Sequence, residues 1–259
     1  MAAAEIQIQI RELCQAHEPE GEARLKFGPV SFDITRGEFL SLVAPCPGGM
    51  AALLKTIAGV IPAAGGEIRV AGEKGRLHPG DVGLVLQRPG LLPWRSVLQN
   101  ILLPAEMLGL DLPDNRNRAR RLMAWFGLSG FDRCWPDDLP PGLDQSVSIC
   151  RALVHSPPLL IMMEPFRMFD SLALEQILDS FQRLWMETGA TGLLGTTSIH
   201  EAVLLSDRVA VMSPPPERII QIFSIDLPRP RRLDKAMTPA ISEYCSRIRT
   251  VFRAQGVLP

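Results

Sequence analysis

Lysine is scarce in this chain of 259 residues. The 27 basic residues are mostly arginine, and lysine occurs only at positions 26, 55, 74 and 235. The formal net charge is −1. Nucleic-acid-binding proteins carry a basic patch or stripe, so this charge balance argues against a nucleic-acid partner.

Paired cysteines and long apolar runs are also missing. The five cysteines are dispersed without C-x-x-C or zinc spacing, and an odd, dispersed set is typical of reduced thiols in a cytosolic protein. No apolar run reaches the ~18–20 residues of a membrane-spanning helix. The start MAAAEIQIQIRE lacks the basic and apolar segments of a signal peptide. The four histidines have no metal-ligand spacing, so we expect no resident metal.

The most informative segment that is present is EFLSLVAPCPGGMAALL, residues 38–54, which contains a Pro/Gly-rich turn. An apolar strand, a Pro/Gly-rich turn and a helical run form the context of a phosphate-binding P-loop. The consensus G-x-x-x-x-G-K-[ST] places Met50 at the lysine and Ala51 at the hydroxyl that ligates Mg²⁺. Gly48 and Gly49 still allow close backbone approach, although an ordinary strand-to-helix turn is the alternative for them.

Short apolar strand patterns alternate with helical patterns along the chain. The expected strands are residues 6–10, 30–34, 39–43, 82–86, 158–163, 192–196 and 209–212. The expected helices are residues 51–58, 116–126, 172–185 and 239–253. Because the pattern also turns helical between Trp94 and His155, the order predicts an α/β core with an inserted helical lobe.

Six motifs in order resemble those of the ATP-binding subunit of an ABC transporter, of the nitrate/taurine/sulfonate importer branch. After the turn come LQRPGLLPWRSVLQNI (86–101), LPPGLDQSVSICRAL (139–153), PPLLIMMEPFRMFD (157–170), TTSIHEAVLLSDRVAVM (196–212) and DLPRPR (226–231). The resemblance implies a P-loop NTPase-like ABC ATPase fold with a RecA-like core sheet, an antiparallel β subdomain and an inserted helical subdomain. It places the core at about 1–90 and 156–225, the helical signature subdomain at about 91–155, and a C-terminal tail helix at about 226–259.

The resemblance also implies a nucleotide site in which several groups are replaced. The positions assigned to nucleotide contact are Gly48, Gly49, Met50, Ala51, Ala52, Gln87, Thr197 and His17, the last in place of an adenine-stacking aromatic. Thr197 replaces the switch histidine, and Met163 replaces the aspartate that coordinates Mg²⁺. Glu164 keeps the position of the general base, where we expect it to be idle. We therefore expect weak ATP binding at most, and Mg²⁺ binding is in doubt.

The signature motif, which in this family faces the partner's nucleotide, is altered as well. Pro140 and Pro141 stand at its serine and first glycine, and Gly142 keeps the second glycine. A proline removes both the hydroxyl and a backbone donor. Asp170 is retained at the D-loop position, and Arg167 stands where the family usually has glycine.

These replacements predict a degenerate, non-hydrolytic subunit with a structural or regulatory role. We expect it to form a heterodimer with a homologous, intact ABC ATPase and to bind an integral-membrane permease through the Gln87 loop and the helical subdomain. It would be cytoplasmic and peripheral on the inner face of the plasma membrane. One alternative is a working ATPase that energises import of a small anion such as nitrate, sulfonate or taurine, so enzyme activity stays open. The other is a stand-alone interaction module. Trp94 is either a transporter contact or a buried anchor.

Overall fold

The computed structural model describes residues 6–17, 24–70, 73–74, 77–110, 112–232 and 237–256. The chain forms two compact units. The first unit combines residues 1–77 with 190–259, and the second unit is residues 78–189. The expected boundaries at 91–155 and 226–259 stay predictions. Among the described residues, no helix has the length and apolar character needed to cross a bilayer.

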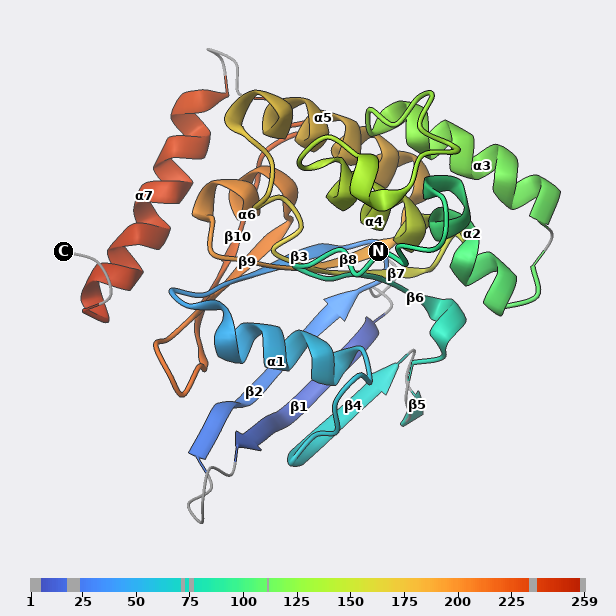
Figure 1. The fold of residues 1–259 in the computed structure, drawn as a ribbon. Coiled ribbons are helices and arrows are strands. Elements are labelled where there is room, and N and C mark those ends of the chain that lie inside the picture. Colours follow the sequence, from blue (N-terminus) through green and yellow to red (C-terminus); the bar gives the residue numbers. More distant parts are fainter. Residues whose placement is uncertain are drawn as a thin grey trace. The chain divides into compact units, whose positions relative to one another are not determined.

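The first unit is built on two groups of strands (Figure 1). Its elements in chain order are β1 (Ile6–His17), β2 (Arg24–Thr35), β3 (Phe39–Val43), α1 (Pro47–Ile57), β4 (Gly65–Val70), β5 (Glu73–Lys74), β8 (Thr191–Thr196), α6 (Ile199–Leu205), β9 (Arg208–Met212), β10 (Ile219–Ser224) and α7 (Thr238–Ala254). An antiparallel sheet has the order β2-β1-β4-β5. The other group has the order β10-β9-β3-β8, with β3 parallel to both β8 and β9.

Two parallel strands of the first unit, β3 and β8, are buried along their whole length. All five residues of β3 and all six of β8 are buried, as expected for strands covered on both faces. Helix α1 contacts β8 as well as β1 and β2, and Figure 1 shows it beside the antiparallel strands. Helix α1 therefore packs against strands of both groups in the first unit.

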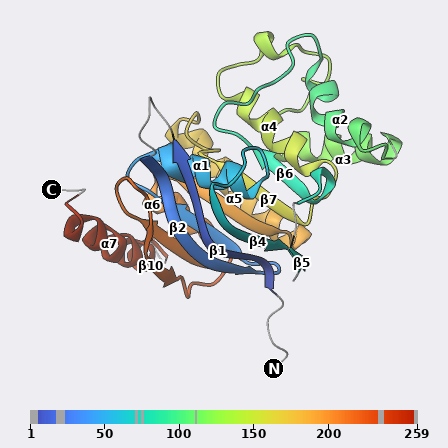
Figure 2. The same ribbon diagram turned by 90° about the horizontal axis from the view of Figure 1, so that it is seen from below.

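The second unit pairs two parallel strands with a cluster of helices (Figure 2). Its elements are β6 (Val82–Val85), α2 (Val97–Met107), α3 (Leu112–Trp125), α4 (Leu143–Leu153), β7 (Leu159–Met163) and α5 (Ser171–Thr188), with 3₁₀ turns at Pro79–Asp81 and Pro136–Asp138. Helices α2, α3 and α4 contact one another. The fully apolar run predicted as a buried strand is β7, whose five residues are all buried.

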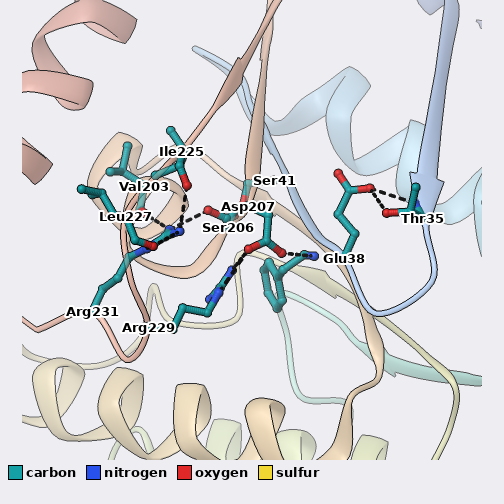
Figure 3. Close-up of polar contacts among 11 residues, drawn as sticks. Thr35, Glu38, Ser41, Val203, Ser206, Asp207, Ile225, Leu227, Arg229 and Arg231 are labelled. Carbon is teal, nitrogen blue, oxygen red and sulfur yellow. Dashed lines mark hydrogen bonds and ion pairs between the residues drawn. The ribbon is translucent and has the colours of Figure 1, made fainter. Parts of the chain in front are cut away.

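The segment that follows β10 is tied down by two arginines (Figure 3). Arg231, only 2% exposed, donates hydrogen bonds to the carbonyls of Val203 (2.7 Å), Ser206 (2.6 Å), Ile225 and Leu227. Arg229 pairs with Asp207 at 2.7 Å, and the same carboxylate accepts from the Phe39 backbone N–H. The segment LPRPRR at 227–232 is thus held without secondary structure by its arginines.

Element boundaries differ from expectation in ways that have local causes. The helix expected at 51–58 begins at Pro47, since proline is well suited to the first helical position. Strands β1 and β2 run longer than 6–10 and 30–34, because they pair with each other through irregular register shifts. Strand β10 was not predicted, and it forms by antiparallel pairing with β9.

Candidate nucleotide site

The β3–α1 turn forms a helix N-terminus at the end of a buried parallel strand. Val43 closes β3, and Pro47 opens α1. Cys46 is the N-cap residue in an extended conformation, and its side chain makes no capping hydrogen bond. The first N–H groups of a helix need partners from outside it, so a cap must come from elsewhere.

That partner is a carboxylate from the loop between β9 and β10. The backbone N–H of Gly49 donates to Glu217 Oε1 at 2.8 Å, and the Cys46 thiol donates to the same oxygen at 3.5 Å. Glu217 is 1% exposed. Burial first, and then the charge and hydrogen bond of Glu217, raise the pKa of the Cys46 thiol above its ordinary value. The anion at this helix N-terminus is therefore a side chain of the protein itself.

Met50, at the position of the P-loop lysine, is directed into the core of the first unit. It is fully buried. A Cβ on Gly195 of β8 would lie 3.2 Å from its Cγ and Sδ atoms. Ala51 is half-buried, Ala52 is buried, and Gly48 is exposed with open space where a Cβ would lie. The turn thus presents glycine and alanine with no cationic side chain between residues 44 and 52.

Thr197 leaves the same sheet edge as the turn. Val43 and Thr196 are partners in the parallel register of β3 and β8, so Ala44 and Thr197 follow neighbouring strand ends. Thr197 is exposed. The Thr196 hydroxyl donates to Glu201 at 2.8 Å and accepts from the Ser198 N–H, which fixes the start of α6.

His200 and His17 lie on two different elements, α6 and the end of β1. Burial lowers the pKa of His200 on α6, and nearby Arg249 lowers it further. His17 ends β1 opposite Arg24, and its side chain lies outside the described set. Its expected contact with adenine stays a prediction.

In the second unit, Gln87 and Glu164 follow two neighbouring strands. Val85 of β6 and Met162 of β7 are partners in a parallel register, so both residues come at one sheet edge. Gln87 is exposed, whereas Glu164 is buried and has a positive φ of 46°. Met163, at the position of the Mg²⁺-coordinating aspartate, is buried. No group of three or more His, Cys, Asp or Glu side chains within the described ranges is placed to hold a metal ion.

The Pro-Pro-Gly turn lies next to the segment that precedes Asp170. Gly142 caps α4 with φ 88°, and a Cβ there would lie 3.5 Å from the carbonyl oxygen of Met168. Pro140 and Pro141 are exposed. Asp170 accepts from the Ala173 N–H at 2.9 Å and so caps α5.

Helix α4 also holds the Gln87 loop, which the sequence did not indicate. Gln145 donates to the Leu86 carbonyl at 3.2 Å. Arg151 donates to the carbonyls of Gly90 and Pro89, and burial lowers its pKa. Trp94, farther along this loop, is 70% exposed, which rules out its interpretation as a buried anchor.

Comparison with known proteins identifies the family of this chain. Residues 27–167, more than half of the chain, match the family described as ABC transporter. The chain belongs to the ABC transporter family. A relative named taurine import ATP-binding protein TauB, from Rhizobium johnstonii, is 36% identical over 77% of this chain and 76% of its own length. The aliphatic sulfonates import ATP-binding protein SsuB 2 of Agrobacterium fabrum is 36% identical over 85% and 82%.

Solved structures support the fold assignment. The dimeric structure of a bacterial ABC transporter cassette superposes with a TM-score of 0.78, covering 85% of this chain and 99% of that one, at 23% identity. This confirms an ABC ATPase fold with a parallel core sheet and an antiparallel sheet.

In the terms of this ABC fold, each unit brings part of the predicted site together. In the first unit, the β3–α1 turn and Thr197 follow neighbouring strand ends, and Met50 points into the core. The second unit gathers Gln87 and Glu164 at one sheet edge, and sets the signature turn beside the D-loop. Sequence reasoning missed Glu217, because its only trace was one acidic residue in the turn SPPPER.

Proposed function

We propose that this chain is a degenerate nucleotide-binding subunit of an ABC importer, with a structural or regulatory role and no ATP hydrolysis at its own P-loop. One observation supports this most directly. The residue at the phosphate-neutralising position is Met50, an apolar side chain fully buried against Gly195. A lysine at this point reaches the β/γ-phosphates in working sites. Met50 carries no positive charge, and its buried side chain does not extend toward a bound phosphate.

The Mg²⁺ ligands of a working site are also replaced. Ala51 has no hydroxyl, and Met163 is a buried thioether in place of a carboxylate. Mg²⁺ prefers oxygen ligands, so these side chains do not fit a Mg²⁺–nucleotide complex. Glu164 would then be a base with no polarised water to act on. Loss of one charge-stabilising group typically costs ~10²–10³ in rate, and several are missing together.

The proposal includes two partners. ABC subunits act as pairs that join one P-loop to the other chain's signature, and two copies of this chain would pair two incomplete sites. We infer that it pairs instead with an intact homologous ATPase. A permease would bind the second unit, where Gln87 and Trp94 are exposed on the same loop. Such an assembly would lie on the inner face of the plasma membrane.

The test compares this chain alone with the assembled transporter. Purified chain should show no Mg²⁺-dependent ATP turnover above background, and Glu164→Gln should change nothing. The equivalent Glu→Gln substitution of the general base in the intact homologue should abolish ATP turnover by the pair. ATP turnover by the chain alone at rates ordinary for transporters, lost in Glu164→Gln, would overturn the proposal in favour of a working subunit.

A second candidate is favoured by the relatives' names. Taurine and aliphatic sulfonates both carry a sulfonate group, so a working subunit would energise import of a small solute with such an anionic group. Co-purification with a permease separates both transporter hypotheses from a stand-alone interaction module. A chain that binds no permease and no homologous ATPase would leave only the module.

A further inference from the structure

We propose that Glu217 is a built-in occupant of the phosphate site, and that a phosphate-bearing ligand can bind the turn only by displacing it. The inference rests on the proposed function only in taking the β3–α1 turn as the nucleotide turn. It concerns equilibrium binding and not hydrolysis. It also assigns a task to a residue that no P-loop pattern contains.

The contact has the chemistry of anion capture. Oxygen Oε1 of Glu217 accepts from the Gly49 N–H at 2.8 Å and from the Cys46 thiol at 3.5 Å. Gly49 is the glycine before the lysine position, whose backbone N–H a bound phosphate would use. Helix N-termini favour negative charge, and Pro45 and Pro47 contribute no N–H donor to this turn. The Glu217 carboxylate thus engages two of the turn's donors, the Gly49 N–H and the Cys46 thiol.

The backbone around Glu217 holds the carboxylate in place. The Gly28 N–H donates to the Glu217 carbonyl at 2.8 Å, and Phe27 forms a β-bridge with Glu217. Arg218 returns a bond to the Gly28 carbonyl at 3.3 Å. The loop is thus anchored to β2, and Glu217 is not a surface side chain that happens to lie nearby.

Such an internal anion lowers the apparent affinity for any external one. Apparent affinity falls by the fraction of molecules in which the site is open. Minor conformations of this kind are typically populated at roughly 0.1–10%. Removing the carboxylate should therefore strengthen anion binding by about tenfold or more.

The experiment is calorimetric titration of inorganic pyrophosphate, and of ATP without Mg²⁺, into the full-length chain. Glu217→Ala and Glu217→Gln should each bind pyrophosphate about tenfold or more tightly than the wild type. The control Glu243→Gln removes a charge from an exposed position on α7 and should behave as the wild type. Equal affinity in the wild type and in a folded Glu217 variant would overturn the inference.

A second readout needs no variant to fold. In the wild type, millimolar pyrophosphate should leave the amide resonance of Gly49 unshifted, because the carboxylate already holds that N–H. A Gly49 shift that saturates at micromolar pyrophosphate would overturn the inference. The two proposals fail separately. If the chain hydrolyses ATP and its Glu217 variants bind pyrophosphate more tightly, only the proposed function is wrong. If the chain is inactive and its Glu217 variants bind pyrophosphate no more tightly than the wild type, only this inference is wrong.

Discussion

The backbone N–H of Gly49 and the carboxylate of Glu217 are joined by a 2.8 Å hydrogen bond across 168 positions of sequence. The bond caps a helix whose own N-cap side chain makes no capping contact. It also places a negative charge at the point where a P-loop holds phosphate. The effect of this carboxylate on its surroundings can be measured, as can the contacts that hold the Gln87 loop and the segment after β10.

Alkylation of Cys46 reports the charge of Glu217. The thiolate is the reactive form, and the pKa of Cys46 is raised, so its alkylation should reach half-maximal rate at a higher pH than an ordinary thiol. Glu217→Gln removes a negative charge that opposes thiolate formation and should move this midpoint to lower pH. Part of the elevation should remain, since burial is its largest cause.

Iodoacetamide rates from pH 7 to 10, resolved by peptide mass spectrometry, check this expectation. Cys134 in the same protein serves as the internal reference, because it is a free cysteine of the second unit. A Cys46 profile that is identical in the wild type and Glu217→Gln would mean that the carboxylate does not act on the thiol.

Restoring the P-loop lysine at position 50 should destabilise the protein. Met50 is fully buried against Gly195 and Leu54 also approaches that glycine, so an ammonium group there would be desolvated. We expect Met50→Lys to lower the free energy of unfolding by about 2–4 kcal/mol. Met50→Leu, which nearly conserves volume, should cost less than about 1.5 kcal/mol. Urea unfolding measures both, and a lysine variant as stable as the leucine variant would contradict the prediction.

Arg151 should control the mobility of the Gln87 loop. It donates to the carbonyls of Pro89 and Gly90 from helix α4. Arg151→Ala should accelerate amide hydrogen exchange in residues 86–92 by roughly tenfold, because local opening loses two bonds. Arg121→Ala, at an exposed position of α3, is the matched control. Unchanged exchange in the Arg151 variant would show that the loop is held by other contacts.

Arg231 should be the most costly arginine to replace. Burial lowers its pKa to about 10, so it stays charged at neutral pH while it donates to four carbonyls. Arg231→Met should lower the free energy of unfolding by about 2–4 kcal/mol, since buried acceptors are left unsatisfied. The exposed neighbour Arg232, replaced by methionine, should cost within about 0.5 kcal/mol. Comparable losses in the two variants would contradict this assignment.

The family and the class of fold were accessible from the sequence because they depend on the order of motifs. The apolar run at 158–163 predicted a buried strand, and β7 is buried throughout. The strand expected at 39–43 is β3 with the same bounds. Strand β10 and the exposure of Trp94 were not accessible, because pairing with β9 and the packing of a loop depend on distant residues.

The sequence by itself determined which groups the nucleotide turn lacks: the lysine at Met50, the hydroxyl at Ala51 and two backbone donors at Pro45 and Pro47. The residue types alone determine these losses, and the order of residues along the turn determines the positions at which they occur. Only the tertiary structure decided which group accepts the hydrogen bond of the Gly49 N–H. A carboxylate 168 positions away reaches Gly49 because the β9–β10 loop is anchored to β2, and no local pattern encodes a contact of that range.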